Sequence, residues 1–259
     1  MSKLTDQDII KKELEKFENK QRSTLPSEIF DLPSGGLVYP KDHPFRSGKV
    51  EMRYMTAYDE DILTNHSYIE EGILFDKLLE ALIVSDGKPS DLSQGDKDAL
   101  IIGARIVSYG AEFPVTVQNP VTKKIESRTV NLRELKTKTF SLIPDDNGEF
   151  IYKTENVEFK FKYLSSAEIN KLTDKNGNLK ISELLGLVIT EIAGERSKEK
   201  IVDFIKFTFR ANDARLFREY ILKNTPGLDM SHEFPINEEG DDGGTFNAVF
   251  QVGSDLFWA

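Results

Sequence analysis

Cysteine is absent from this chain of 259 residues, and tryptophan occurs only once. The lack of thiols excludes disulfide bonds, thiolate zinc sites and cysteine nucleophiles, and it suits a reducing compartment. No stretch approaches the roughly 18 to 20 consecutive apolar residues that cross a bilayer, and residues 1–20 lack the apolar core of a signal peptide. The sequence therefore predicts neither a membrane-spanning nor a secreted protein.

Positive charge is the scarcer sign, because 34 Lys and Arg face 44 Asp and Glu and give a formal net charge of −10. This excess opposes non-specific attraction to nucleic acid and to anionic membranes, so we expect neither as a partner. The basic group Lys123, Lys124 and Arg128 lacks the interleaved aromatic side chains that stack on single-stranded bases. It is typical of a solubilising hairpin tip.

Catalytic and cofactor motifs are missing as well. The three histidines, His43, His66 and His232, do not have metal-ligand spacing. The sequence contains no G-x-S-x-G motif, and Gly35 and Gly36 do not begin a phosphate-binding loop. We therefore expect no cofactor, no metal and no enzymatic activity.

Two acidic patterns favour other functions. Residues 174–185 imitate a calcium-binding loop, but Leu179 stands where the bend needs glycine and Leu185 where a bidentate glutamate is needed. A polar turn before a helix explains the same residues. Adjacent acids such as Glu70 and Glu71 leave an acid/base hydrolase as a remote alternative, because sequence does not give the separation of two carboxyl groups across a cleft.

The N-terminal residues 6–20 have the period of an amphipathic helix. Ile10, Leu14 and Phe17 fall at i, i+4 and i+7 and form a narrow apolar stripe, opposite a face crowded with Lys and Glu. The stripe either docks on the chain's own domain or binds a partner, and both interpretations stay open. Residues 1–31 are accordingly predicted to be an N-terminal helix and a linker.

The segment 32–40 alternates rigid and flexible residues. Pro33 and Pro40 restrict φ and favour extended residues before them, while two adjacent glycines open the positive-φ region. Leu37 and Tyr39 then share one face of a short extended segment. We take both as candidate contacts with a partner protein.

The remainder, residues 32–259, predicts a mainly helical α+β body. Apolar periodicity indicates helices, which we place at residues 70–84, 93–110, 166–172, 182–193, 197–209 and 214–222. Alternating runs between turn residues indicate small antiparallel β modules at about 112–163 and 231–259. The first contains hairpins at 113–132 and 148–163, and the hairpin 113–132 is expected to pack against residues 232–252 or on the helical body.

The C-terminal pair Phe257 and Trp258 is costly to leave in water. Either this tail closes its own domain, which is the favoured alternative, or it anchors in another subunit. Both residues are candidate partner contacts.

Four features together resemble a family of baseplate and tail-assembly proteins from T-even-like contractile phages. They are residues 32–40, the helix pair after Tyr58, the junction Ser108-Tyr109-Gly110 before a small β module, and the terminal Phe257-Trp258. The resemblance implies a non-enzymatic, chaperone-like factor for assembly of the baseplate hub, acting in the host cell cytoplasm by binding other phage tail or hub proteins. The alternative it implies is a permanent structural subunit of the virion baseplate. Partner identity and oligomeric state stay open.

The resemblance also bears on metal binding. Relatives often carry a Cys-Pro-x-Cys-Gly turn where this chain has Asn119-Pro120-Val121-Thr122-Lys123, and a second such turn near residues 233–236. A chain without these cysteines implies β modules that resemble a metal-free zinc ribbon. Packing among aromatic side chains would then replace the metal, and the candidates are Phe113, Phe234, Phe246 and Phe250.

Overall fold

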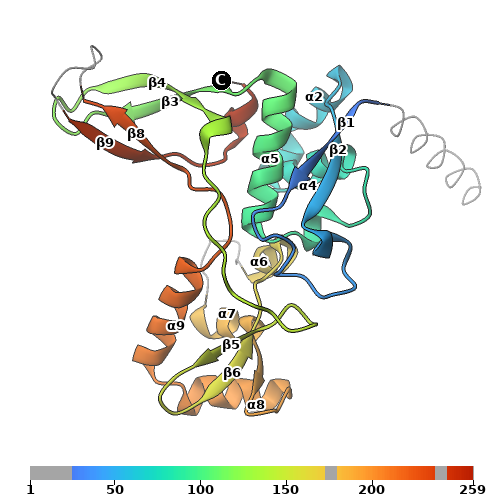
Figure 1. Ribbon diagram of the computed structural model, residues 1–259, viewed down its shortest axis with the longest axis vertical. Helices are drawn as coiled ribbons and strands as arrows, with labels where there is room; N and C mark the ends of the chain where they lie inside the picture. The colour runs from blue at the N-terminus through green and yellow to red at the C-terminus, as the bar shows by residue number, and fades with distance from the viewer. Residues whose placement is uncertain (1–24, 173–179, 237–243, 259) are drawn as a thin grey trace, which may run out of the picture.

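The computed structural model describes residues 25–172, 180–236 and 244–258. Helices and small antiparallel sheets build an α+β protein with an upper and a lower lobe (Figure 1). The chain forms most of the upper lobe, descends through residues 132–149 into the lower lobe, and returns along residues 224–230. The lower lobe is thus inserted between two hairpins that both belong to the upper lobe.

A two-stranded sheet and a helical layer form the first half of the upper lobe. Strands β1 (Ser27–Asp31) and β2 (Lys49–Arg53) are antiparallel. The helices that cover them are α2 (Ala57–Leu63), α3 (His66–Glu70), α4 (Leu74–Leu82) and α5 (Gln94–Tyr109). Residues 27–31 were predicted to lie in a linker, and they form β1 instead.

Local signals account for the ends of these helices. Ser93 caps α5 by accepting a hydrogen bond from the Asp96 amide at 3.4 Å, and Gly110 ends the helix with φ of +89°, as predicted. The single helix expected over residues 70–84 is wrong at its start. Gly72 has φ of +69°, a left-handed conformation that interrupts the helix and separates α3 from α4.

Residues 32–40 form consecutive turns. Gly35 and Gly36 have positive φ, as expected, and a Cβ on Gly36 would lie 2.3 Å from the Arg46 carbonyl oxygen. The Tyr39 amide donates to the Gly36 carbonyl at 3.2 Å, and the Leu37 amide donates likewise within the segment. The predicted extended segment is therefore wrong, because turn hydrogen bonds replace it.

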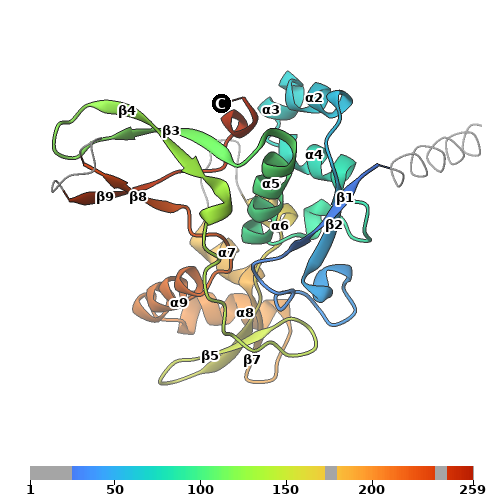
Figure 2. The ribbon, with the colours of Figure 1, turned by 45° about the horizontal axis from the view of Figure 1, so that its top comes forward.

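Two β hairpins lie side by side at one end of the upper lobe (Figures 1 and 2). They consist of β3 (Glu112–Gln118) with β4 (Ile125–Asn131), and of β8 (Ser231–Pro235) with β9 (Thr245–Val249). The Phe113 and Phe250 ring centroids are 6.2 Å apart, and Asn119 Nδ2 donates to the Ile236 carbonyl at 2.9 Å. The prediction that these modules pack together is confirmed.

The lower lobe surrounds a three-stranded antiparallel sheet with helices. Its strands are β5 (Phe150–Lys153), β6 (Glu158–Phe161) and β7 (Ile189–Ile192). Its helices are α6 (Ser166–Leu172), α7 (Ile181–Val188), α8 (Lys198–Asp203), the π-helical turn Phe204–Thr208, and α9 (Ala211–Lys223). The helix expected over residues 182–193 is wrong in its second half, because Ile189 leaves the helix and pairs with β6 as strand β7.

Aromatic packing closes this lobe. The ring of Phe217 on α9 is fully buried and lies 4.9 Å from Phe159, 5.3 Å from Phe161 and 4.9 Å from Tyr152. The contacts with Phe159 and Phe161 are near-perpendicular, a ring geometry that stabilises beyond the burial of apolar area. Strands β5 and β6 are therefore held on α9.

Main-chain contacts join the two lobes. The Ser166 amide donates to the Leu92 carbonyl at 2.8 Å, and the Lys41 amide donates to the Asp146 carbonyl at 2.8 Å. Gly95 at the start of α5 approaches the Pro226 backbone so closely that a Cβ would lie 2.0 Å from the Pro226 oxygen. Within the described parts of the chain, no helix is long and apolar enough to cross a membrane.

Candidate partner-binding surfaces

The structure describes four of the seven predicted contact residues. Ile10, Leu14 and Phe17 lie outside the described residues. Leu37 is half-buried, and its carbonyl accepts a hydrogen bond from Arg46 at 3.3 Å. The other three residues are Tyr39, Phe257 and Trp258. That any of the seven binds a partner stays a prediction.

Tyr39 is an interior residue, only 4% exposed. Its hydroxyl donates to Asp96 Oδ2 at 2.6 Å and accepts from the Ser93 amide at 3.0 Å. Burial, followed by the nearby Asp96 carboxylate, raises the pKa of Tyr39 far above its ordinary value. In the isolated chain Tyr39 therefore fixes the segment 32–40 to helix α5 and is not an exposed contact.

Asp96 is the centre of this arrangement and is completely buried. Besides Tyr39, it accepts hydrogen bonds from the Ser34 amide at 2.9 Å, the Ser34 hydroxyl at 2.7 Å and the Ser93 hydroxyl at 2.9 Å. Four donors compensate for the loss of water around its carboxylate. The sequence indicated Asp96 only as part of the α5 cap, because its partners Ser34 and Tyr39 are distant along the chain.

The C-terminal turn Ser254–Phe257 docks on helices α4 and α5 (Figure 1). Phe257 is 3% exposed, and its ring lies 6.4 Å from Phe75 and 6.1 Å from Tyr109. The favoured alternative for Phe257, closure of its own domain, is confirmed. Trp258 follows this anchored residue and stays 52% exposed.

Arg105 holds the C-terminal turn in place. Its buried guanidinium donates to the carbonyl oxygens of Leu256 at 2.8 Å, Gly110 at 2.6 Å and Glu112 at 3.2 Å. Burial lowers the pKa of Arg105. Arg105 was not among the residues predicted from the sequence, although an arginine beside Ala104 in an apolar helix run is a signal of a buried cation.

Tyr109 borders the exposed Trp258 end of the turn. Its ring packs on Phe257, and its hydroxyl donates to Glu60 Oε1 at 2.7 Å. Partial burial, with Glu60 as the next cause, raises the pKa of Tyr109 to about 12. We call Tyr109, Phe257 and Trp258 the C-terminal surface; it presents one half-exposed indole on a rigid support.

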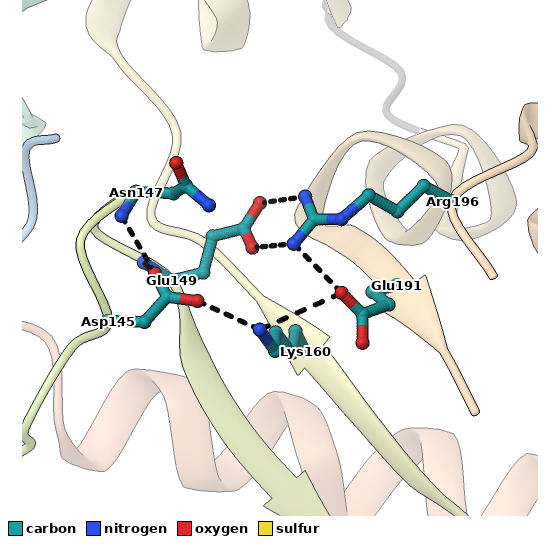
Figure 3. A network of polar contacts seen from close by, with 6 residues as sticks. All are labelled: Asp145, Asn147, Glu149, Lys160, Glu191 and Arg196. Carbon is teal, nitrogen blue, oxygen red and sulfur yellow. Dashed lines mark hydrogen bonds and ion pairs between the residues drawn. The ribbon is translucent and has the colours of Figure 1, made fainter. Parts of the chain in front are cut away.

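A polar network ties the lower-lobe sheet to the descending segment (Figure 3). Arg196 binds both carboxylate oxygens of the buried Glu149 at 3.0 and 2.7 Å, and also Glu191 at 2.8 Å. Lys160 binds Asp145 at 2.9 Å and Glu191 at 3.7 Å. Burial favours the neutral form of Asp145, but hydrogen bonds led by that from Lys160 outweigh it and lower the pKa of Asp145. Each carboxylate here is paired with a cation, which indicates a structural role.

An apolar pocket of about 290 Å³ opens between the lobes. It lies where the start of α5 meets α6, α7 and α9, and its walls include Leu184, Val188, Ile221 and Leu222. Arg218 lines it as well. The pocket suits an apolar group and contains no cluster of catalytic side chains among the residues that line it.

The turn at residues 119–123 is held by Asn119. Its Oδ1 accepts from the Val121 and Thr122 amides at 3.0 and 3.1 Å, while its Nδ2 reaches Ile236 in the second hairpin. In the described ranges, no three His, Cys, Asp or Glu residues are grouped to hold a metal ion. The first half of the calcium-like loop, residues 174–179, lies outside them.

Comparison with known protein families identifies a matching family. A family model described as "T4 bacteriophage base plate protein" matches residues 26–234, from the residue before β1 to the fourth residue of β8. The chain matches no curated protein and no solved structure.

Proposed function

Because the chain belongs to the T4 bacteriophage base plate protein family, we propose that it assists assembly of the hub of a contractile phage tail by binding other tail proteins. A role in the phage baseplate follows from the family itself, whose model spans residues 26–234 and carries the proposal. The finer role, a chaperone-like factor that catalyses no reaction and acts in the host cytoplasm, is our proposal.

The C-terminal surface supports a binding role. Phe257 is anchored by packing, and Arg105 binds the Leu256 carbonyl, so the backbone that carries the half-exposed Trp258 is already held in place. Binding through Trp258 would therefore cost little further conformational entropy. Tryptophan is enriched among residues that dominate binding energies. The net charge of −10 limits non-specific association elsewhere on the surface.

A permanent structural subunit of the virion baseplate is the second candidate. The description of the family as a base plate protein favours it. Quantitative mass spectrometry of purified virions separates the two. An assembly factor is present in infected cells bound to hub proteins and absent from virions, whereas a structural subunit persists in virions at fixed copy number. Failure to find the chain with any baseplate protein in either sample would contradict both.

We propose further that the paired hairpins are a metal-free counterpart of a zinc ribbon. The contact of Asn119 with Ile236 joins the two turns where a metal would otherwise join them, and the packing of Phe113 on Phe250 joins the opposite ends of the two hairpins. Purified protein should contain no stoichiometric zinc by elemental analysis. One zinc per chain would contradict this proposal without affecting the baseplate role.

A further inference from the structure

A groove of about 560 Å³ runs between strand β3 and the chain that continues from β9 towards the C-terminus. Six consecutive residues on each side line it, 113–118 and 248–253. Successive side chains of a strand point to opposite faces. A groove that touches six consecutive residues of a strand therefore follows the edge of that strand.

The edge of β3 along this groove is unpaired. Among the described strands, β3 is hydrogen-bonded only to β4. The Asn119 amide donates to the Lys124 carbonyl at 2.9 Å, and the Leu132 amide donates to the Ala111 carbonyl at 2.9 Å. These bonds show that the odd-numbered residues of β3 form the hydrogen-bonded pairs with β4. Because hydrogen-bonded and non-hydrogen-bonded pairs alternate, Thr116 and Gln118 direct their main-chain groups away from β4. Pro114 offers only its carbonyl there.

Strand β9 also has an unpaired edge, because its only partner among the described strands is β8. The Phe250 amide donates to the Met230 carbonyl at 3.2 Å, and the Ile236 amide donates to the Gly244 carbonyl at 3.0 Å. Since Phe250 and Gly244 are therefore in hydrogen-bonded pairs, Val249 and Gln251 direct their N–H and C=O groups away from β8. Both walls of the groove thus carry main-chain donors and acceptors that the sheets leave unused.

We propose that an extended segment of another baseplate protein binds in this groove as an added β-strand; this inference rests on the proposed function. Only a polypeptide strand offers N–H and C=O groups on alternate sides at the spacing of a strand edge. A groove six residues long matches a segment of about 20 Å. The inward side chains of Phe113, Val115 and Phe250 then provide apolar contacts for alternate residues of the segment.

Charge favours a different protein over a second copy of this chain. Among the described residues that line the groove, Asp255 is the one ionisable residue. Two copies with a net charge of −10 each repel one another. The segment that binds therefore carries apolar residues at alternate positions and Lys or Arg at the end that faces Asp255.

Amide hydrogen exchange tests this placement on the full chain, alone and in the hub or baseplate complex purified from infected cells. In the free chain the amides of Thr116, Gln118, Val249 and Gln251 should exchange rapidly, because they lack partners. In the complex they should exchange at least about tenfold more slowly. Main-chain groups of the opposite hairpin edge, such as Ser127, should not change.

A matched pair of proline substitutions tests the edge itself. Thr116 and Ser127 face each other as a non-hydrogen-bonded pair of β3 and β4, so Thr116→Pro and Ser127→Pro each remove one outward N–H and no ladder bond. Thr116→Pro should reduce incorporation into the complex at least about tenfold, and Ser127→Pro should not. Circular dichroism confirms folding; if Thr116→Pro fails to fold, exchange on the wild-type chain decides.

The possible results are distinguishable. A complex in which the four amides exchange as in the free chain overturns the inference and leaves the baseplate role intact. Equal loss of incorporation in both proline variants also overturns it. A chain that is found with no baseplate protein contradicts the proposed function and this inference together.

Discussion

Tyr39 illustrates how a single buried hydroxyl holds two distant segments together. Replacing it with phenylalanine removes a donor to Asp96 and the acceptor of the Ser93 amide. We expect Tyr39→Phe to lower the free energy of unfolding by about 1–3 kcal/mol, measured by urea denaturation. Tyr58→Phe, at a residue that is 77% exposed, is the control and should change it by less than about 0.5 kcal/mol. Equal effects would contradict the structural role of Tyr39.

The buried pair Arg53 and Asp59 predicts a dependence of stability on pH. Two hydrogen bonds of 2.7 Å join them. Burial favours the neutral acid, but the bonds from Arg53 and Thr56 outweigh it and lower the pKa of Asp59 below its ordinary 3.8. The stability that the ionised carboxylate contributes is therefore complete above pH 3.8 and is lost as the pH falls through the lower folded-state pKa.

The variant Asp59→Asn tests this dependence. It leaves Arg53 buried without a counter-charge and should cost about 3–5 kcal/mol at pH 7, a difference that narrows as the pH falls below 4. Urea denaturation followed through the fluorescence of Trp258 measures it. Asp31→Asn removes a similar carboxylate, also 2.7 Å from a cation, but one that is exposed. It should cost less than about 1 kcal/mol; a pH-independent Asp59→Asn difference would contradict the linkage.

At the residue scale, the features that could be predicted from the sequence are those fixed by local backbone geometry, such as helix caps and turns. Ser93 as the cap of α5, Gly110 as its end and Gly36 with positive φ are all confirmed, because each depends on neighbours within a few positions. Arg105 and the long-range partners of Asp96 were missed. Their partners are backbone carbonyls, amides and hydroxyls far along the chain, and no residue pattern marks such partners.

At the element scale, the errors lie where tertiary pairing overrides apolar periodicity. Residues 182–193 fit a helical pattern. Ile189 and Ile192 nevertheless pair with β6, because this strand pairing completes the lower-lobe sheet. Strand β1 was missed because its five residues show no clear alternation, and its pairing with β2 forms across an intervening loop. Hairpins closed by short turns were predicted correctly, since both strands and the turn are adjacent in sequence.

Helix α5 meets the lower lobe through Gly95, which leads to a prediction for this junction. A methyl group there would lie 2.0 Å from the Pro226 carbonyl oxygen, and backbone cannot yield as a flexible side chain does. Gly95→Ala should therefore destabilise the protein by about 1–3 kcal/mol, although alanine favours a helix by about 1 kcal/mol over glycine.

Gly186 in helix α7 provides the matched control for this test. No atom lies within 4 Å of a Cβ built at Gly186. Gly186→Ala should raise the free energy of unfolding by up to about 1 kcal/mol, the gain in helix propensity. Thermal unfolding measures both variants. A stabilising Gly95→Ala would show that the two lobes do not meet closely at this point.

At the scale of the whole molecule, the chain order explains why the C-terminus is structural. The lower lobe is inserted between the two hairpins, so the chain must return to the upper lobe after Lys223, the last residue of α9 (Figure 2). Phe257 and the bond from Arg105 to Leu256 fasten this return to α5. The sequence predicted the burial of the terminal aromatic pair as a unit, whereas the structure divides it into an anchor and a half-exposed neighbour.

Because Phe257 is buried and Trp258 is half-exposed, substitutions at these two neighbours should affect stability and tail assembly differently. Phe257→Ala should lower the free energy of unfolding by about 3–5 kcal/mol because it empties a buried site. Trp258→Ala should cost about 1 kcal/mol or less, since half of its side chain already faces water. If the C-terminal surface binds another tail protein, Trp258→Ala should nevertheless reduce the yield of assembled tails at least about tenfold, as loss of an interface tryptophan does.

Phe207→Ala is the control for this test, because Phe207 is an aromatic residue of the lower lobe that is 81% exposed. Complementation of infected cells, with tails counted by electron microscopy, measures the yield, and thermal unfolding measures stability. A Trp258→Ala variant that is stable and assembles as well as Phe207→Ala would remove the C-terminal surface from the binding role. Since family membership rests on residues 26–234, the baseplate assignment would remain.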